Sequence, residues 1–330
     1  MAVTRLLIVT FVAIVLGSRA EAQTLTTEVD TTGGYSTEGV KAAATQFRVF
    51  GEGPASWRYF AEGTWADVWG PDSDAFGSAY PYTDRIRAME IFAEKTVTRS
   101  SFIVGTRLGR YRTPFGLYNR GDHGYAGFLR APLIRYGGYW ALSNYFLETG
   151  ASVVAGTPWL QAEVSLGIPQ DEGEGRRHRG LDRVGRLQAS VGSLIVGGSY
   201  IHTKPSDEYP WAQGSTEFVG MDARWMKAGV QLRGEWIDGR AFDGTRTFGG
   251  YADVIVHRQF MGPITAVGRV ERLDYIAGPF SSYPRRYTAG AKIRLARMLM
   301  AHVNVLREPA YDDEGPESSF DVGLTFTARR

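Results

Sequence analysis

The sequence contains no cysteine among its 330 residues. It therefore has no disulfide framework, no thiolate zinc module and no cysteine nucleophile. The five histidines are scattered without metal-ligand spacing, and no G-x-S-x-G nucleophile motif occurs. These absences predict a chain that is not an enzyme, with no catalytic residues, metal or cofactor.

A large excess of charge of one sign is also missing. The formal net charge is +2, from 37 Lys and Arg against 35 Asp and Glu. A nucleic-acid-binding protein would show a basic stripe or patch, and none is visible here. We therefore expect no nucleic-acid partner.

Long apolar runs are limited to one short segment near the N-terminus. Leu6–Leu16 is apolar but too short to span a bilayer comfortably as a helix. It follows Arg5 and precedes Ala20-Glu21-Ala22, which has the small-x-small form of a signal-peptidase site. Residues 1–22 are therefore predicted to be a cleaved signal peptide. An uncleaved membrane anchor is the alternative, and the lack of cysteine excludes a lipoprotein anchor.

After residue 23 no apolar run approaches the roughly 20 residues of a membrane helix. The exported chain is then periplasmic, secreted or a β-barrel. A barrel can cross a membrane without a strongly hydrophobic sequence, because half of each strand faces water.

What the sequence does contain is apolar–polar alternation with a period of two. Between residues 158 and 168, Leu160, Val164 and Leu166 share one face, whereas Gln161 and Glu163 share the other. The same pattern recurs in segments 230–236, 287–295 and 320–327. Strands of soluble sandwiches run about five to six residues. The predicted strands that contain these segments run about nine to twelve residues, which is the length of a tilted membrane strand.

The connections between these segments alternate between short and long. Short turns are predicted near residues 51–54, 97–100, 156–158, 192–194, 225–228, 259–263 and 296–298. Longer polar connections are predicted at 68–84, 111–144, 168–182, 204–214, 238–245, 274–284 and 308–317. Short periplasmic turns with longer external loops are typical of outer-membrane barrels. Fifteen strands follow residue 44, and an additional strand at Leu25–Thr31 returns the N-terminus to the periplasm. We therefore predict one all-β domain over residues 23–330, a transmembrane antiparallel barrel of about sixteen strands (14–18), wide enough for an aqueous channel.

Aromatic residues near the strand ends predict girdles at the two membrane interfaces. They are Trp57, Trp65, Phe92, Phe102, Phe146, Trp159, Tyr200, Trp225, Trp236, Tyr287 and Phe320. Ordinary core aromatics are the alternative reading.

The polar faces of the strands define the predicted pore lining. Its members are Arg58, Arg107, Arg186, Arg224, Arg233, Arg269, Lys292, Arg294, Glu163, Glu235 and Glu271. Strong selectivity would need rings of one sign, whereas this wall is mixed. Inward ion pairs and solvation of a wet interior are the alternative role for each residue.

The connection at 111–144 is long, and its aromatic content argues against disorder. Folded into the channel, it would narrow the pore and present guanidinium groups to carboxylates or phosphates. The predicted constriction and anion-binding residues are Arg110, Arg112, Arg120, Arg130, Arg135, Tyr111 and Tyr118. Alternatively, the connection is an external cap whose arginines bind lipopolysaccharide phosphates.

Gly105–Asn119 reads GTRLGRYRTPFGLYN, a strand running into Pro114-Phe115-Gly116. It resembles the segment before the constricting loop in the phosphate-selective porins O and P and their dicarboxylate- and sugar-porin relatives. The resemblance implies a sixteen-stranded barrel, usually a homotrimer, with an arginine-lined pore. The chain is shorter than typical members and has no dense lysine cluster, which favours a general or weakly anion-selective channel.

Together these features predict a porin-like passive diffusion channel for small polar or anionic solutes in the bacterial outer membrane. Outer-membrane lipid, lipopolysaccharide and the barrel-assembly machinery are the expected partners. Phe326 provides an aromatic in the last strand, as that machinery requires, although four residues follow it. A non-conducting adhesin or structural anchor, a barrel phospholipase using His202, and a soluble lectin-like protein are the alternatives.

Overall fold

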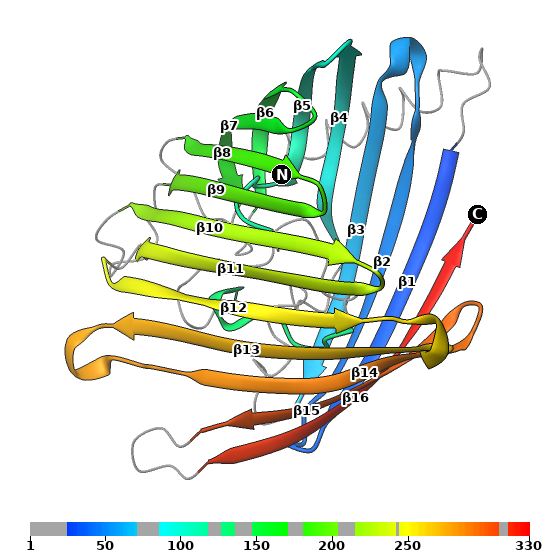
Figure 1. Ribbon diagram of the computed structural model, residues 1–330, viewed down its shortest axis with the longest axis vertical. Helices are drawn as coiled ribbons and strands as arrows, with labels where there is room; N and C mark the ends of the chain where they lie inside the picture. Colours follow the sequence, from blue (N-terminus) through cyan, green and yellow to red (C-terminus); the bar gives the residue numbers. More distant parts are fainter. Residues whose placement is uncertain are drawn as a thin grey trace.

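The computed structural model is a closed antiparallel β-barrel of sixteen strands (Figure 1). The structure describes residues 25–70, 86–117, 127–135, 147–170, 181–203, 215–241, 244–309 and 316–330. The strands are β1 (Leu25–Ser36), β2 (Lys41–Glu52), β3 (Arg58–Trp69), β4 (Arg87–Arg99), β5 (Phe102–Arg112), β6 (Leu147–Gly156), β7 (Leu160–Gln170), β8 (Asp182–Val191), β9 (Leu194–Thr203), β10 (Thr216–Lys227), β11 (Val230–Arg240), β12 (Arg246–Val256), β13 (Ile264–Ile276), β14 (Arg285–Ala296), β15 (Leu299–Glu308) and β16 (Glu317–Arg329). Single 3₁₀ turns are η1 (Pro54–Ser56), η3 (Leu133–Arg135), η5 (Gln259–Met261) and η6 (Gly278–Phe280).

The first and last strands close the ring. β1 pairs with β16 from Glu28↔Arg329 to Ser36↔Asp321, and the two strands lie side by side in Figure 1. Every other strand pairs with its neighbours in sequence. The predicted fold and strand number are confirmed, including the strand that begins at Leu25.

The predicted short turns all lie at one end of the barrel. The β10–β11 turn consists of Ala228 and Gly229, with φ values of 50° and 76°. Two consecutive residues with positive φ form the tight hairpin turn whose twist matches that of the flanking strands. The ends of β1 and β16 at residues 25 and 329 lie at this same end of the barrel, because Leu25 pairs with Gly51 of β2 and Glu28 pairs with Arg329.

Burial is reversed relative to a soluble protein. On β7, Val164 and Leu166 are 57% and 50% exposed on the outer wall, whereas Ser165 is buried. Charged side chains such as Arg233 and Glu235 of β11 are buried inside, and Leu232 and Trp236, which flank them in sequence, are exposed. An apolar outer band around a polar interior is the arrangement of a membrane barrel and excludes a soluble sandwich, whose apolar faces would meet.

Most described members of the predicted aromatic girdles lie on the outer wall. Phe102, Trp159, Tyr200 and Trp236 are among those exposed there. The girdle prediction is wrong for Phe92, which lies on the inner face opposite Phe60 and lines a cavity with glutamates and arginines. Phe92 lies two residues from both Glu90 and Glu94, so the period of two places it on their inner face.

No helix among the described residues is long and apolar enough to cross a membrane. The predicted signal peptide, residues 1–22, lies outside the described residues and stays a prediction.

Candidate pore

The described parts of the long connection between β5 and β6 lie inside the barrel. Its described parts, 113–117 and 127–135, leave the end of β5 and contact the inner faces of strands on the opposite wall. Gly116 donates its backbone N–H to Ser199 Oγ of β9 at 3.1 Å, and Leu133 donates to Glu271 Oε2 of β13 at 2.7 Å. The sequence left open whether this connection caps the barrel or enters it, and the described parts enter it.

An apolar cluster fastens the segment to the inner wall. Phe115 and Ile134 of the connection are buried with Ile201, Phe218 and Leu273 of the wall. This is the reason that some inward positions of β8–β13 are apolar, although the rest of the interior is polar. Each fully buried side chain of this size contributes about 1.5–3 kcal/mol relative to an exposed one. The segment is therefore an integral part of the fold.

Arg135 forms the most deeply buried ionic contact of the segment. Its Nη2 lies 2.5 Å from Glu235 Oε1 of β11, and both side chains are fully buried. The same Nη2 donates to the carbonyl oxygen of Phe115 at 3.3 Å. Nε and Nη1 of Arg135 have no hydrogen-bond partner among the described residues. Arg135 therefore joins both described parts of the connection to the wall.

Arg130 provides a second attachment, beside the β1–β16 pairing that closes the barrel. Its Nε lies 2.7 Å from Asp321 Oδ2 of β16, and its Nη2 lies 3.0 Å from Glu38 Oε2 in the β1–β2 connection. Its carbonyl oxygen accepts a hydrogen bond from Arg269 at 3.0 Å. Arg286 of β14 donates likewise to the carbonyl oxygen of Ala131 at 2.6 Å. These contacts satisfy backbone groups that would otherwise be buried without partners.

The remaining predicted constriction residues are dispersed. Nη2 of Arg112 lies 2.7 Å from Glu62 Oε1 of β3, and its Nη1 lies 3.5 Å from Glu90 Oε2 of β4. Tyr111 is buried and its hydroxyl lies 2.9 Å from Ser165 Oγ of β7. Arg110 lies opposite Ile91 of β4, and its Nε has no hydrogen-bond partner among the described residues. Tyr118 and Arg120 lie outside the described residues.

The wall beneath the segment contains buried charge pairs. Arg186 of β8 holds Asp222 of β10, with Nη2–Oδ1 at 2.8 Å. Asp253 of β12 lies between Arg233 and Arg269, at 2.8 and 2.7 Å. Four of the predicted lining residues in this region are therefore ion-paired and buried: Arg186, Arg233 and Arg269, with Glu235 bound by Arg135. Glu271 is likewise held by Arg286 at 2.9 Å.

An open cavity of about 560 Å³ lies on the other side of the lumen, against β1–β5. Its lining contains five glutamates and three arginines: Glu28, Glu52, Glu62, Glu90, Glu94, Arg48, Arg58 and Arg112. The described part of the connection packs mostly against β8–β16, so this cavity is the part of the interior that it leaves open. Its charged lining is linked by ion pairs rather than arranged as a ring of one sign.

Two features of this cavity were missed by the sequence analysis. Arg48 of β2 contacts Glu28, Asp30 and Glu62, at 2.7, 2.6 and 2.8 Å. Its place between Phe47 and Val49 in the alternation was the signal that could have identified it. The second feature is a row of three phenyl rings across β2, β3 and β4. Phe60 stacks on Phe50 and Phe92, with ring centroids 6.4 and 5.2 Å away.

The other predicted lining residues lie near the short-turn end or beside the cavity. Arg58 and Arg107 both contact Glu94, each at 3.1 Å, and Arg107 also approaches Glu163 at 4.0 Å. Arg224 and Arg294 are exposed and form no ion pair with a described residue. Lys292 of β14 lies beside Gly127 of the inward segment, the name used from here on for residues 113–117 and 127–135.

The described residues contain no cluster of three or more groups that could hold a metal ion. His202, the residue considered for a phospholipase, is paired in register with Arg183 and Glu217 on the adjacent strands. Those cross-strand neighbours are not serines, so a Ser–His pair is not formed at these positions.

Solved structures place this architecture among known folds. No protein-family model matches the sequence, and no curated protein matches it. The structure is similar to Salmonella typhi OmpF in complex with daunomycin, at 12% identity and a TM-score of 0.65, covering 93% of this chain and 97% of that chain. The chain has the fold of the outer-membrane porins.

Two further porin-fold structures support this. The anion-selective porin from Comamonas acidovorans is 15% identical, with a TM-score of 0.62 and coverage of 93% of this chain and 99% of that one. OmpT from Vibrio cholerae, an outer membrane protein in a trimer form, is 8% identical, with a TM-score of 0.57 and coverage of 93% and 99%. Likeness at this identity establishes the fold, and the resemblance to the phosphate-selective porins stays a prediction.

Proposed function

We propose that the protein is a passive diffusion channel for small polar solutes in the bacterial outer membrane. The observation that carries the proposal is the division of the interior. One side is filled by the inward segment at 113–117 and 127–135, and the other keeps an open cavity with a charged lining. A barrel that served only as an anchor would gain nothing from a wet, charged passage, because burying charge costs free energy unless each charge is paired or solvated.

The charges of the cavity support weak selectivity. Five glutamates face three arginines, so the described lining has a surplus of negative charge. The anion preference expected from the sequence depended on the arginines in and beside the 111–144 connection, and two of these, Arg130 and Arg135, are ion-paired to the wall. We therefore propose that neutral and cationic solutes pass at least as readily as anions, with Arg58, Arg107 and Arg112 keeping anions from being excluded.

The surroundings of the channel follow from the same proposal. The exported chain would lose residues 1–22, be inserted by the barrel-assembly machinery and place its long connections outside. OmpT of Vibrio cholerae is described in a trimer form, and we propose a homotrimer here too. Phe326 of β16 is 41% exposed on the outer wall, where the assembly machinery could recognise it.

The decisive experiment is single-channel recording of the refolded chain 23–330 in a planar bilayer. Stepwise conductance is expected, with a reversal potential in a salt gradient that is near zero or shifted toward cations. A strong anion shift would contradict the proposed selectivity while leaving the channel intact. Absence of steps, in protein shown to be folded by heat-modifiable gel mobility, would favour the adhesin or anchor instead.

A further inference from the structure

The outer wall of β13–β15 carries a cluster of arginines at the end of the barrel where the long connections lie. Arg272 of β13, Arg285 of β14 and Arg307 of β15 are all exposed. They share the outward face of the wall, because Glu271, Arg286 and Leu306 beside them in sequence are buried within. In the proposed orientation, this is the external rim of the membrane.

The register brings these arginines together. Arg272 lies directly opposite Arg285, and Tyr287, two residues further along β14, lies opposite Arg307. Directly opposite residues have Cβ atoms about 5 Å apart, and diagonal neighbours are about 7–8 Å apart. The long guanidinium side chains of Arg285 and Arg307, at these diagonal positions, can reach a single anionic group.

The cluster has positive charge that the protein does not neutralise. Arg272 is paired with Asp274, to which it donates through both Nε and Nη2, so the charge left without a partner lies on Arg285 and Arg307. Arg285 and Arg307 make no hydrogen bond or ion pair with any residue that the structure describes. Arginines directly opposite each other repel and lower the stability of a strand pair unless an anion lies between them.

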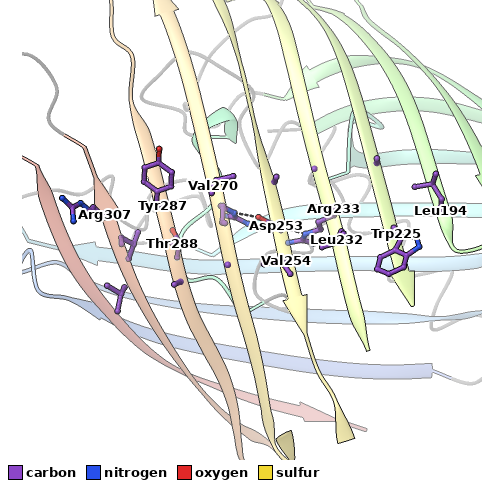
Figure 2. Close-up of a pocket in the computed structure, with 18 residues that line it drawn as sticks. Leu194, Trp225, Leu232, Arg233, Asp253, Val254, Val270, Tyr287, Thr288 and Arg307 are labelled. Atoms are coloured by element: carbon purple, nitrogen blue, oxygen red, sulfur yellow. Dashed lines mark hydrogen bonds and ion pairs between the residues drawn. The ribbon is translucent and has the colours of Figure 1, made fainter. Parts of the chain in front are cut away.

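An apolar groove of about 850 Å³ runs from this cluster along the outer wall (Figure 2). Ala252, Gly268 and Ala289 are small residues along it, and bulkier side chains such as Val254 and Val270 rise around them. Arg307 and Tyr287 belong to the same lining, and Figure 2 shows Arg307, Tyr287 and Val270 on adjacent strands. The groove and the cluster are therefore continuous.

We propose that this surface binds an anionic lipid of the outer leaflet, with a phosphate on Arg285 and Arg307, next to the Arg272–Asp274 pair, and an acyl chain in the groove. Guanidinium groups match phosphate geometry by donating two parallel hydrogen bonds. A groove lined by small apolar residues can accommodate a hydrocarbon chain. In the proposed orientation this rim meets the outer leaflet. The lipid that fits there is therefore a phosphorylated, acylated saccharide such as lipid A.

The test measures binding of lipid A to the folded full-length barrel in detergent by native mass spectrometry. We expect the double variant Arg285→Gln/Arg307→Gln to bind at least about tenfold more weakly, since each interfacial charge contributes roughly 1 kcal/mol. The matched control is Arg258→Gln/Arg297→Gln, which removes two exposed arginines from turns at the opposite rim of the same wall. Equal binding by both double variants would overturn the proposal.

Two further arms separate the sources of binding. Dephosphorylated lipid A should bind weakly to the unaltered protein, and inorganic phosphate should compete only at millimolar concentration. Ala252→Leu should weaken binding of lipid A but not of its deacylated phosphosugar. If Ala252→Leu instead dissociates an oligomer and lipid binding is unchanged, the groove is an interface with a second copy and the proposal fails. Conductance should persist in every variant. Failure of the lipid-binding proposal is therefore distinguishable from failure of the proposed channel function.

Discussion

Arg135 of the inward segment and Glu235 of β11 form an ion pair at 2.5 Å in a fully buried position between the segment and the barrel wall. Removing one partner leaves the other as an uncompensated buried charge, which costs about 3–5 kcal/mol. We expect Arg135→Ala to release the segment from the wall and to increase single-channel conductance. The measurement is planar-bilayer recording, together with trypsin cleavage in the released segment.

The control for this pair replaces both partners. In Arg135→Met/Glu235→Leu no charge stays buried, and such replacements are often neutral or stabilising. The double variant should therefore keep the conductance of the unaltered protein and resist trypsin. Equal conductance in the single variant and the unaltered protein would show that Arg135 does not hold the segment in the passage.

Gly116 provides a steric test of the same attachment. Its φ is 65°, and a Cβ at this position would overlap Glu235 Oε1. Gly116→Ala should displace the carboxylate from Arg135 and raise conductance. Gly278→Ala is the matched control, because φ is 62° there and nothing lies within 4 Å of the added Cβ. The control isolates the conformational cost of about 1–2 kcal/mol, measured from urea unfolding midpoints, and should leave conductance unchanged.

Arg112 is expected to influence ion selectivity directly. It compensates Glu62 and Glu90 at the edge of the open cavity. Arg112→Gln should add one unit of net negative charge there and shift the reversal potential in a salt gradient toward cations. Arg258→Gln, in the β12–β13 turn outside the lumen, carries the same charge change and should not shift it. Identical reversal potentials in the two variants would remove Arg112 from the conducting path.

The absence of cysteine allows a labelling test of which face each strand residue occupies. Glu163→Cys should react in membranes with a charged, water-soluble maleimide, because residue 163 lies beside the cavity near Arg107. Val164→Cys should react only with a lipophilic reagent, since residue 164 is exposed on the outer wall. Similar rates with the charged reagent would contradict the assignment of the two faces.

The sequence by itself determined the barrel. Alternation over segments such as Leu160–Ile168 predicts which side of each strand faces lipid, and the spacing of turns predicts about sixteen strands joined in sequence. Both are local properties, because a β-strand has a period of two and a hairpin connects adjacent strands. The same alternation placed Arg186, Arg233 and Arg269 on the inner face.

Only the tertiary structure decided what these inner residues do. Arg130 and Arg135 look like free anion-binding groups in the sequence, but their partners Asp321 and Glu235 are 191 and 100 residues away. The open cavity against β1–β5 and the arginine cluster on β13–β15 likewise depend on cross-strand register and on the path of one long connection. No local periodicity encodes such long-range pairings, because they arise when the closed ring brings distant strands to one interior and one outer wall.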